Sequence, residues 1–151
     1  MIINLTDEER IHLLAHNYIG HLAYVYKGRP FIAPITYYYD KENNYVICYS
    51  AEGHKITAMR KQNAVALEVA EIQSVNNWNS IVVHGVYEEV DKSLAKAYLH
   101  DFSLGVKDLI IHKEQRELDF ISQFSSKIYK NDVPIVFLIR IEEITGKKRR
   151  F

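Results

Sequence analysis

The 151-residue sequence has little of several features that would place it in a familiar class. It contains one cysteine, Cys48, which excludes an intrachain disulfide and a multi-cysteine metal cage. Lys plus Arg and Asp plus Glu both number 19, so no overall charge attracts nucleic acid. No apolar run approaches the roughly 20 residues that a spanning helix needs, and the N-terminus carries acids where a signal peptide carries bases. We expect a cytoplasmic protein of one domain, residues 1–151, without a nucleic-acid or membrane partner.

Common motifs of nucleotide-binding proteins and hydrolases are also missing. The sequence lacks GxxxxGK[ST] and GxGxxG, the usual phosphate-binding motifs for ATP and NAD. It also lacks the GxSxG nucleophile elbow of serine hydrolases. His12 and His16 have a spacing that can place two imidazoles on one metal, but HExxH is absent and no third ligand is indicated. We therefore expect no metal site.

The patterns that are present predict mainly strands. Thr6 and Glu9 form a capping box, which predicts a helix from about Asp7. Runs of strand formers predict a hairpin and further strands, over residues 19–26, 30–39, 45–50, 64–72, 79–90 and 133–144. Helical spacing predicts helices over 94–102 and 118–128, and Gly85 marks a bulge or a close backbone approach. Because strands and helices do not alternate, we expect an antiparallel α+β fold with a closed or partly closed barrel.

The segment "CYSAEGHKITAMRKQN", residues 48–63, ends a strand and begins a helix crowded with cations. The free N–H groups and dipole of a helix start favour an anion. Ser50, Gly53 and Lys55 would bring a hydroxyl, backbone donors and a positive charge to one place, which suits a phosphate. In the alternative, Ser50 caps the helix and the cations form a solvated surface. Spacing alone does not decide between these interpretations.

Three segments in order resemble a known family. They are "IGHLAYVYKGRPFIAPITYYYD", "YVICYSAEGHKITAMRKQNAVALEV" and "NNWNSIVVHGVYEEV". Together they resemble the FMN-binding split-barrel family, the pyridoxamine 5'-phosphate oxidase-like proteins, and within it the nitroimidazole-resistance (Nim-like) branch. The resemblance implies a six-stranded antiparallel split β-barrel (Greek key) with flanking helices. It also implies a homodimer with the cofactor at the subunit interface, and the eleven Tyr residues suit such half-buried surfaces.

The resemblance also implies a set of cofactor-binding residues. The backbone from Ala33 to Thr36 would lie along the flavin ring, residues 49–51 would flank the ribityl chain and phosphate, and Lys55 with His54 would clamp the phosphate. Two residues of the other subunit would close over the cleft. The complete set is Ala33, Pro34, Ile35, Thr36, Tyr49, Ser50, Ala51, His54, Lys55, and, from the other subunit, Trp78 and Ser80.

Two histidines are further candidates at the ring edge. They are His21 and His84, and His84 has the alternative of an ordinary core or interface residue. No catalytic residue is identified, since the chemistry of such a protein belongs to the cofactor.

The activity implied is that of an FMN oxidoreductase. It would pass electrons from a reduced nicotinamide or similar donor to a small acceptor such as a nitroaromatic. The C-terminus "TGKKRRF" lacks the arginine and tryptophan segment of pyridoxamine phosphate oxidase proper, so that activity is not expected. Relatives that bind deazaflavin F420 or haem make these the alternative cofactors. A non-catalytic flavin or haem binding or carrier protein is the alternative function, and residues 94–129 show no recognisable chemistry.

Overall fold

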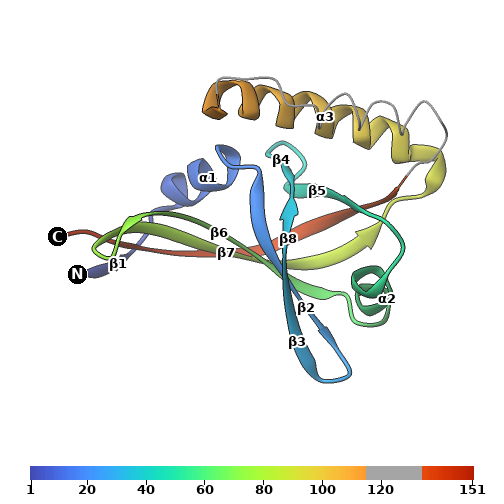
Figure 1. The fold of residues 1–151 in the computed structure, drawn as a ribbon, viewed down its shortest axis with the longest axis horizontal. Helices are drawn as coiled ribbons and strands as arrows, with labels where there is room; N and C mark the ends of the chain where they lie inside the picture. The colour runs from blue at the N-terminus through green and yellow to red at the C-terminus, as the bar shows by residue number, and fades with distance from the viewer. Residues whose placement is uncertain (115–133) are drawn as a thin grey trace.

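The computed structural model describes residues 1–114 and 134–151 (Figure 1). The helix predicted over 118–128 lies outside the described residues. The elements are β1 (Ile2–Asn4), α1 (Asp7–Ala15), β2 (Ile19–Tyr26), β3 (Arg29–Thr36), β4 (Tyr38–Asp40), β5 (Tyr45–Ser50), α2 (His54–Lys61), β6 (Ala64–Ser74), β7 (Asn77–Glu89), α3 (Lys92–Glu114) and β8 (Ile135–Arg149).

All the described strands belong to one antiparallel sheet. Its order is β3-β2-β6-β7-β8-β5-β4, and β1 pairs with the far end of β8. The predicted antiparallel, mainly β class with flanking helices is confirmed. Two details differ: the path of paired strands does not close within the described residues, and the strands number eight instead of six.

The additional strands have clear physical origins. The predicted strand over 30–39 is divided into β3 and β4 at Tyr37, whose side chain is fully buried and whose hydroxyl donates to the Leu14 carbonyl at 2.7 Å. This bond fixes the chain beneath α1. The other addition, β1, is three residues long and pairs with Lys147–Arg149 near the C-terminus. Three residues are too few to show the alternation of apolar and polar side chains from which a strand is predicted.

Two hairpins project from the sheet in different directions (Figure 1). The β2–β3 hairpin extends on the side of α2, while the β6–β7 hairpin extends to the other end, beside both termini. α1 and α3 lie over the sheet on the side opposite the β2–β3 hairpin. None of the helices in the described residues is long and apolar enough to cross a membrane.

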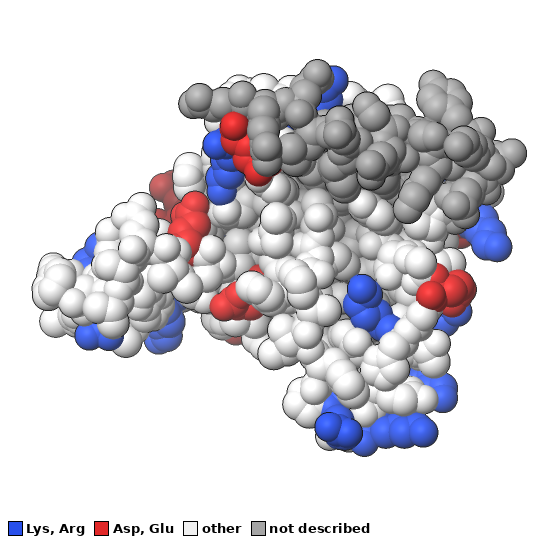
Figure 2. Space-filling model, viewed as in Figure 1, with Lys and Arg blue, Asp and Glu red and all other residues white. Residues whose placement is uncertain are grey.

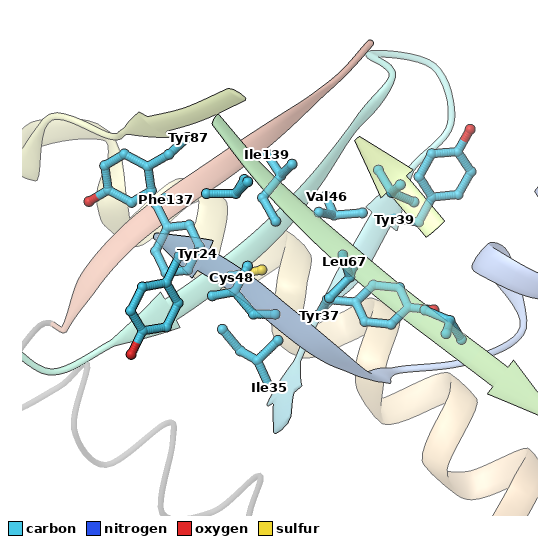
Figure 3. Packing of buried hydrophobic residues seen from close by; sticks show 14 of the residues in the cluster. Tyr24, Ile35, Tyr37, Tyr39, Val46, Cys48, Leu67, Tyr87, Phe137 and Ile139 are labelled. Carbon is cyan, nitrogen blue, oxygen red and sulfur yellow. The ribbon is translucent and has the colours of Figure 1, made fainter. Parts of the chain in front are cut away.

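The main core fills the concave side of the sheet (Figure 3). Alternate residues of β2, β5, β6 and β8 point into it, as the two-residue period of a strand requires, and Leu22, Cys48 and Leu67 are fully buried there. Fully burying a side chain of this kind contributes about 1.5–3 kcal/mol. Burial also raises the pKa of the Cys48 thiol, which keeps it protonated and unreactive.

A second cluster joins α3 to the other side of β5 and β8. Leu99, Phe102 and Val106 of α3 pack on Ile47 of β5 and Leu138 of β8. The helix predicted over 94–102 is thus confirmed and extends to Glu114. Within the described residues, the role of this segment is to cover the sheet.

Two local predictions are confirmed in detail. The Thr6 hydroxyl accepts from the Glu9 N–H at 3.2 Å and the Glu9 carboxylate accepts from the Thr6 N–H at 3.0 Å, which starts α1 at Asp7. Hydrogen bonds from Lys148 and from the Thr6 N–H lower the pKa of Glu9 to about 2.

At Gly85 the strand bulges, and a Cβ there would lie 2.4 Å from the Arg140 carbonyl oxygen, so a side chain does not fit.

Candidate functional site

The start of α2 offers backbone donors that no side chain covers. β5 ends at Ser50, and residues 51–53 lead into α2, whose N-cap is Gly53. Gly53 provides no capping side chain, and no acidic residue lies in the first turn. The first N–H groups of a helix have no partner within the helix, and together with the dipole they favour a negative ligand. A phosphate therefore fits this position.

Lys55 is the cation placed to join these donors. It is half-buried in the first turn of α2, and the described structure shows no ion pair between it and a carboxylate. A lysine in this position adds a point charge to the N–H groups. The two features that the phosphate hypothesis needs, uncapped N–H groups and a nearby lysine, are therefore both present at the start of α2.

Arg60 is committed elsewhere. Its guanidinium donates to Glu89 at 2.7 Å and to Glu52 at 2.9 Å, and the Tyr87 hydroxyl donates to Glu89 at 2.8 Å. The hydrogen bond from Arg60 lowers the pKa of the Glu89 carboxyl, and Glu89 and Glu52 raise the pKa of Arg60. This network neutralises one of the three Lys and Arg residues in segment 48–63, so the helix does not present a uniformly basic surface.

His54 faces the β2–β3 hairpin. Its Nδ1 forms a 3.1 Å hydrogen bond with the Tyr24 hydroxyl, and its ring lies edge-on to Tyr26 and Phe31, with centroids 4.9 and 4.7 Å away. The first helical residue is thereby fixed against the hairpin. Sequence reasoning missed Tyr24 and Phe31 as neighbours of His54. The two-residue turn predicts that these two residues pair across the hairpin, but not that they contact His54.

The backbone of β3 has an open side, and the strand contacts the helix start through the Phe31 and His54 rings. Among the described strands β3 pairs with β2 alone. The Tyr37 N–H donates to the Tyr18 carbonyl, and because alternate residues of an antiparallel strand face the partner, Ala33 and Ile35 bond to β2 while Pro34 and Thr36 face away. Pro34 has no N–H, so Thr36 supplies the amide and the hydroxyl of this predicted stretch on the open side.

The side chains of this stretch divide between core and surface. Ile35 is 8% exposed and packs in the main core, Ala33 and Thr36 are half-buried, and Pro34 is exposed. Any contact of Ile35 with a ligand on the open side of β3 would therefore be through its backbone.

Residues 49–51 are adjacent to the helix start but point in different directions. The Tyr49 ring packs perpendicular to Phe102 of α3, with centroids 5.2 Å apart, so its side chain faces the second cluster. Ser50 lies on the opposite face, and its hydroxyl donates to the Ala51 carbonyl at 3.1 Å. Of the three, Ser50 is half-buried and Ala51 is exposed, so only these two are not packed in the second cluster.

Trp78 and Ser80 lie in another part of the chain. Both are half-buried near the start of β7, where Trp78 pairs with Arg149 and Ile72. Tyr87, which bonds to Asn63 just after α2, is nine positions further along β7, or roughly 30 Å at the rise of a strand. Within one described chain, the two groups of predicted residues are therefore not brought together.

The remaining histidines lie outside the helix start. Nδ1 of His21 is 3.0 Å from a Glu68 carboxylate oxygen across β2 and β6, and exposed His84 lines an open cavity of about 340 Å³ with Glu142. Sequence reasoning did not identify Glu68. His12 and His16 stack with ring centroids 3.8 Å apart. In the described part of the chain, no group of three or more potential ligands is arranged to hold a metal ion.

Comparison with known proteins gives a consistent family. The family model for Pyridoxamine 5'-phosphate oxidase matches residues 6–148. An uncharacterised protein of Rhizobium meliloti (strain 1021) is 29% identical over 147 residues, which are 95% of this chain and 92% of the relative. A FAD-binding protein from Mesorhizobium loti has a similar solved structure, with a TM-score of 0.73, 25% identity and 98% of each chain covered.

Two more distant structures share the fold. A candidate 5-nitroimidazole antibiotic resistance protein from Bacteroides thetaiotaomicron has a TM-score of 0.69 at 17% identity, over 98% of this chain and 87% of that one. The FAD and heme binding protein from Mycobacterium smegmatis has a TM-score of 0.72 at 15% identity, over 98% of this chain and 74% of that one. The match over residues 6–148 confirms the family that the sequence resembles, and the chain belongs to the Pyridoxamine 5'-phosphate oxidase family.

Proposed function

We propose that this protein is a homodimeric flavin oxidoreductase. It would bind the flavin mononucleotide part that FMN and FAD share, and it would pass electrons from a reduced nicotinamide or similar donor to a small acceptor such as a nitroaromatic. The observation that carries the proposal is the uncapped start of α2 with Lys55, and the open side of β3, whose Phe31 ring contacts His54, supports it. The similar Mesorhizobium loti protein, which binds FAD by its description, supports a flavin as the ligand.

Each part of the chain has a stated task in this proposal. The first N–H groups of α2 and Lys55 hold the phosphate, with Ser50 beside them. The Thr36 amide and hydroxyl hydrogen-bond the polar edge of the ring along β3. The flavin supplies hydride and electron transfer when it is bound, so the chain must bind it, orient it and exclude water.

The position of Trp78 and Ser80 supports the second copy in this proposal. They lie at the far end of β7 from α2, so they can close over a helix start only if it belongs to another chain. Ile72 and Val75 lie on the β6–β7 hairpin, which also carries Trp78, and their side chains are 74% and 75% exposed. Burying such side chains against a second copy would favour association.

The first test is the absorption spectrum of the purified protein, followed by release and mass determination of the bound pigment. Flavin bands, or their appearance after FMN is added, support the proposal. A protein that remains colourless with added FMN overturns it. A sharp Soret band without flavin would instead indicate a haem-binding protein.

The shared site is tested by mixing two variants. Lys55→Ala and Trp78→Ala homodimers should each bind FMN weakly, because every site lacks one contributor. Subunit exchange between them creates heterodimers with one complete site, so FMN binding should recover in up to half of the sites of each heterodimer. Mixing two separately purified Lys55→Ala samples is the matched control. No recovery after proven exchange contradicts a site made from two copies.

A further inference from the structure

The tip of the β2–β3 hairpin carries a basic and aromatic surface that the proposed flavin site does not use. We name it the hairpin patch and define it by Tyr26, Lys27, Arg29, Phe31 and Lys61. The first four residues surround the turn between β2 and β3, and Lys61 ends α2. All are exposed or half-buried.

The cations of the hairpin patch lie on aromatic rings. Nζ of Lys27 and Nζ of Lys61 are 5.3 and 5.5 Å from the Tyr26 ring centre, and the Arg29 guanidinium is 6.0 Å from that of Phe31. Cation–π contacts at exposed positions are weak, so these groups can turn to a stronger anionic partner. An aromatic surface edged by flexible cations is the arrangement that accepts a base and its phosphates.

No carboxylate offsets these charges in the sequence around them. Residues 19–39 and 53–67 contain no Asp or Glu. Figure 2 shows the consequence at its lower end, where Figure 1 places the hairpin: Lys and Arg are visible there, and Asp and Glu are not seen in this view. An uncompensated group of cations next to a predicted phosphate position favours a further negative group.

The turn itself indicates that the Lys27 side chain matters. Lys27 and Gly28 both have positive φ, 51° and 76°, as a two-residue hairpin turn requires. Asn or Asp is the usual first residue of such a turn, since their side chains tolerate this conformation, whereas Lys has no such compensation. Lys27 therefore places a long cation at a position where a short polar residue is more usual.

The hairpin patch also adjoins the proposed phosphate position. His54, the residue before Lys55, contacts both Tyr26 and Phe31 with its ring. The two phosphates of a dinucleotide are joined through one oxygen, so a second phosphate would lie next to the first.

We propose that the hairpin patch binds the adenosine monophosphate part of a dinucleotide, in the first place FAD, with the cations on the second phosphate and the adenine on Tyr26. The inference rests on the proposed function, because the first phosphate is the one held at α2. The same chemistry would also accept the adenosine monophosphate part of a reduced nicotinamide donor.

The experiment compares FMN and FAD on the flavin-free full-length protein by titration calorimetry. The wild type should bind FAD roughly tenfold more tightly than FMN, as expected for added phosphate contacts and base stacking. The double variant Lys27→Asn with Lys61→Gln should bring this ratio close to one. Asn suits the turn, so a lost preference cannot be attributed to a misfolded hairpin. Lys41→Gln with Lys96→Gln, which removes the same charge near α3, is the matched control and should keep the ratio.

A second arm identifies the source of the adenosine monophosphate. If FAD and FMN bind equally but the double variant weakens NADPH binding to the FMN-loaded protein roughly tenfold, the patch serves the donor. Equal affinities together with unchanged NADPH binding overturn the inference and leave the flavin proposal intact. Failure of the wild type to bind either flavin instead overturns the proposed function.

Discussion

The two sides of this molecule carry opposite charges around similar aromatic rings. On the α2 side, His54, Lys55 and the hairpin patch combine cations with tyrosine and phenylalanine. On the α3 side, an open cavity of about 570 Å³ is lined by Tyr38 and Tyr39 together with Asp40, Lys41, Glu42, Asp101, Leu104, Gly105 and Asp108. The lining of this cavity is therefore mainly acidic, whereas the hairpin patch is basic.

The acidic cavity is not a candidate for the proposed phosphate. Burial and the carboxylates of Asp40, Asp101, Asp108 and Glu42 raise the pKa of Tyr38 there. Such surroundings repel an anion. The α2 side has the donors and charges that the proposed phosphate needs.

Charge reversal gives the largest expected difference between the two sides. Lys55→Glu should lower FMN affinity by roughly 100-fold, because hydrogen bonds to charged groups contribute about 1.5–3 kcal/mol and the new carboxylate also repels the phosphate. Lys41→Glu makes the same charge change on the acidic side and should alter the affinity less than about twofold. Fluorescence titration measures both. Equal losses would contradict the assignment of the phosphate to α2.

Filling the contact between α3 and β4 should affect stability alone. A Cβ at Gly105 would lie 2.0–2.7 Å from ring atoms of Tyr38, so Gly105→Ala must displace that ring. Overpacking of this kind costs about 1–3 kcal/mol, measured as a lower free energy of unfolding in urea. FMN affinity of the folded protein should not change. Gly105→Ser is a second variant with the same contact, and a loss of FMN binding in both would connect the acidic side to the site.

Removing one hydroxyl on each side gives a smaller effect. Tyr24→Phe removes the hydrogen bond to His54 and should weaken FMN binding roughly fivefold through a less ordered α2 start, since such a bond contributes about 1 kcal/mol. Tyr38→Phe is the matched change on the acidic side and should leave FMN affinity unaltered. Tyr24→Phe without effect would mean that the aromatic contacts of His54 are sufficient to hold the helix.

The smallest effect is a difference in pH response. The pKa of Glu89 is lowered by Arg60, so its contribution to stability is present above the ordinary value of 4.5 and is lost as pH falls below it. The pKa of Tyr38 is raised from 10, so its contribution is present below that value and is lost as pH rises. In thermal unfolding, Glu89→Gln should flatten the acidic limb and Tyr38→Phe the alkaline limb. A flatter alkaline limb in Glu89→Gln, or a flatter acidic limb in Tyr38→Phe, would contradict these contacts.

Sequence reasoning worked where the cause is local. The Thr6 capping box, the turn that precedes α2 and the close approach at Gly85 are each decided by a few neighbouring residues, and the structure contains all three. The strands followed from apolar patterns, except the three-residue β1 and the break at Tyr37, which is fixed by a hydrogen bond to a distant helix.

The arrangement of the site depended on contacts between distant residues. Arg60 looked like a free cation because Glu89, its partner, lies 29 residues away. Whether His54 faces a ligand or the hairpin is decided by Tyr24, 30 residues earlier. The distance from Trp78 to α2 depends on the full length of β7 and on its pairing, which no local pattern specifies.

The open side of β3 has a consequence for solubility. An unpaired strand edge usually invites a strand of another molecule to add to the sheet, which leads to aggregation. In β3 the residues that face outward alternate with those bonded to β2, and they include Pro30 and Pro34, neither of which has an N–H to donate. A foreign strand would lose alternate hydrogen bonds along this edge. The edge can thus remain accessible to a small planar molecule while resisting addition of another chain.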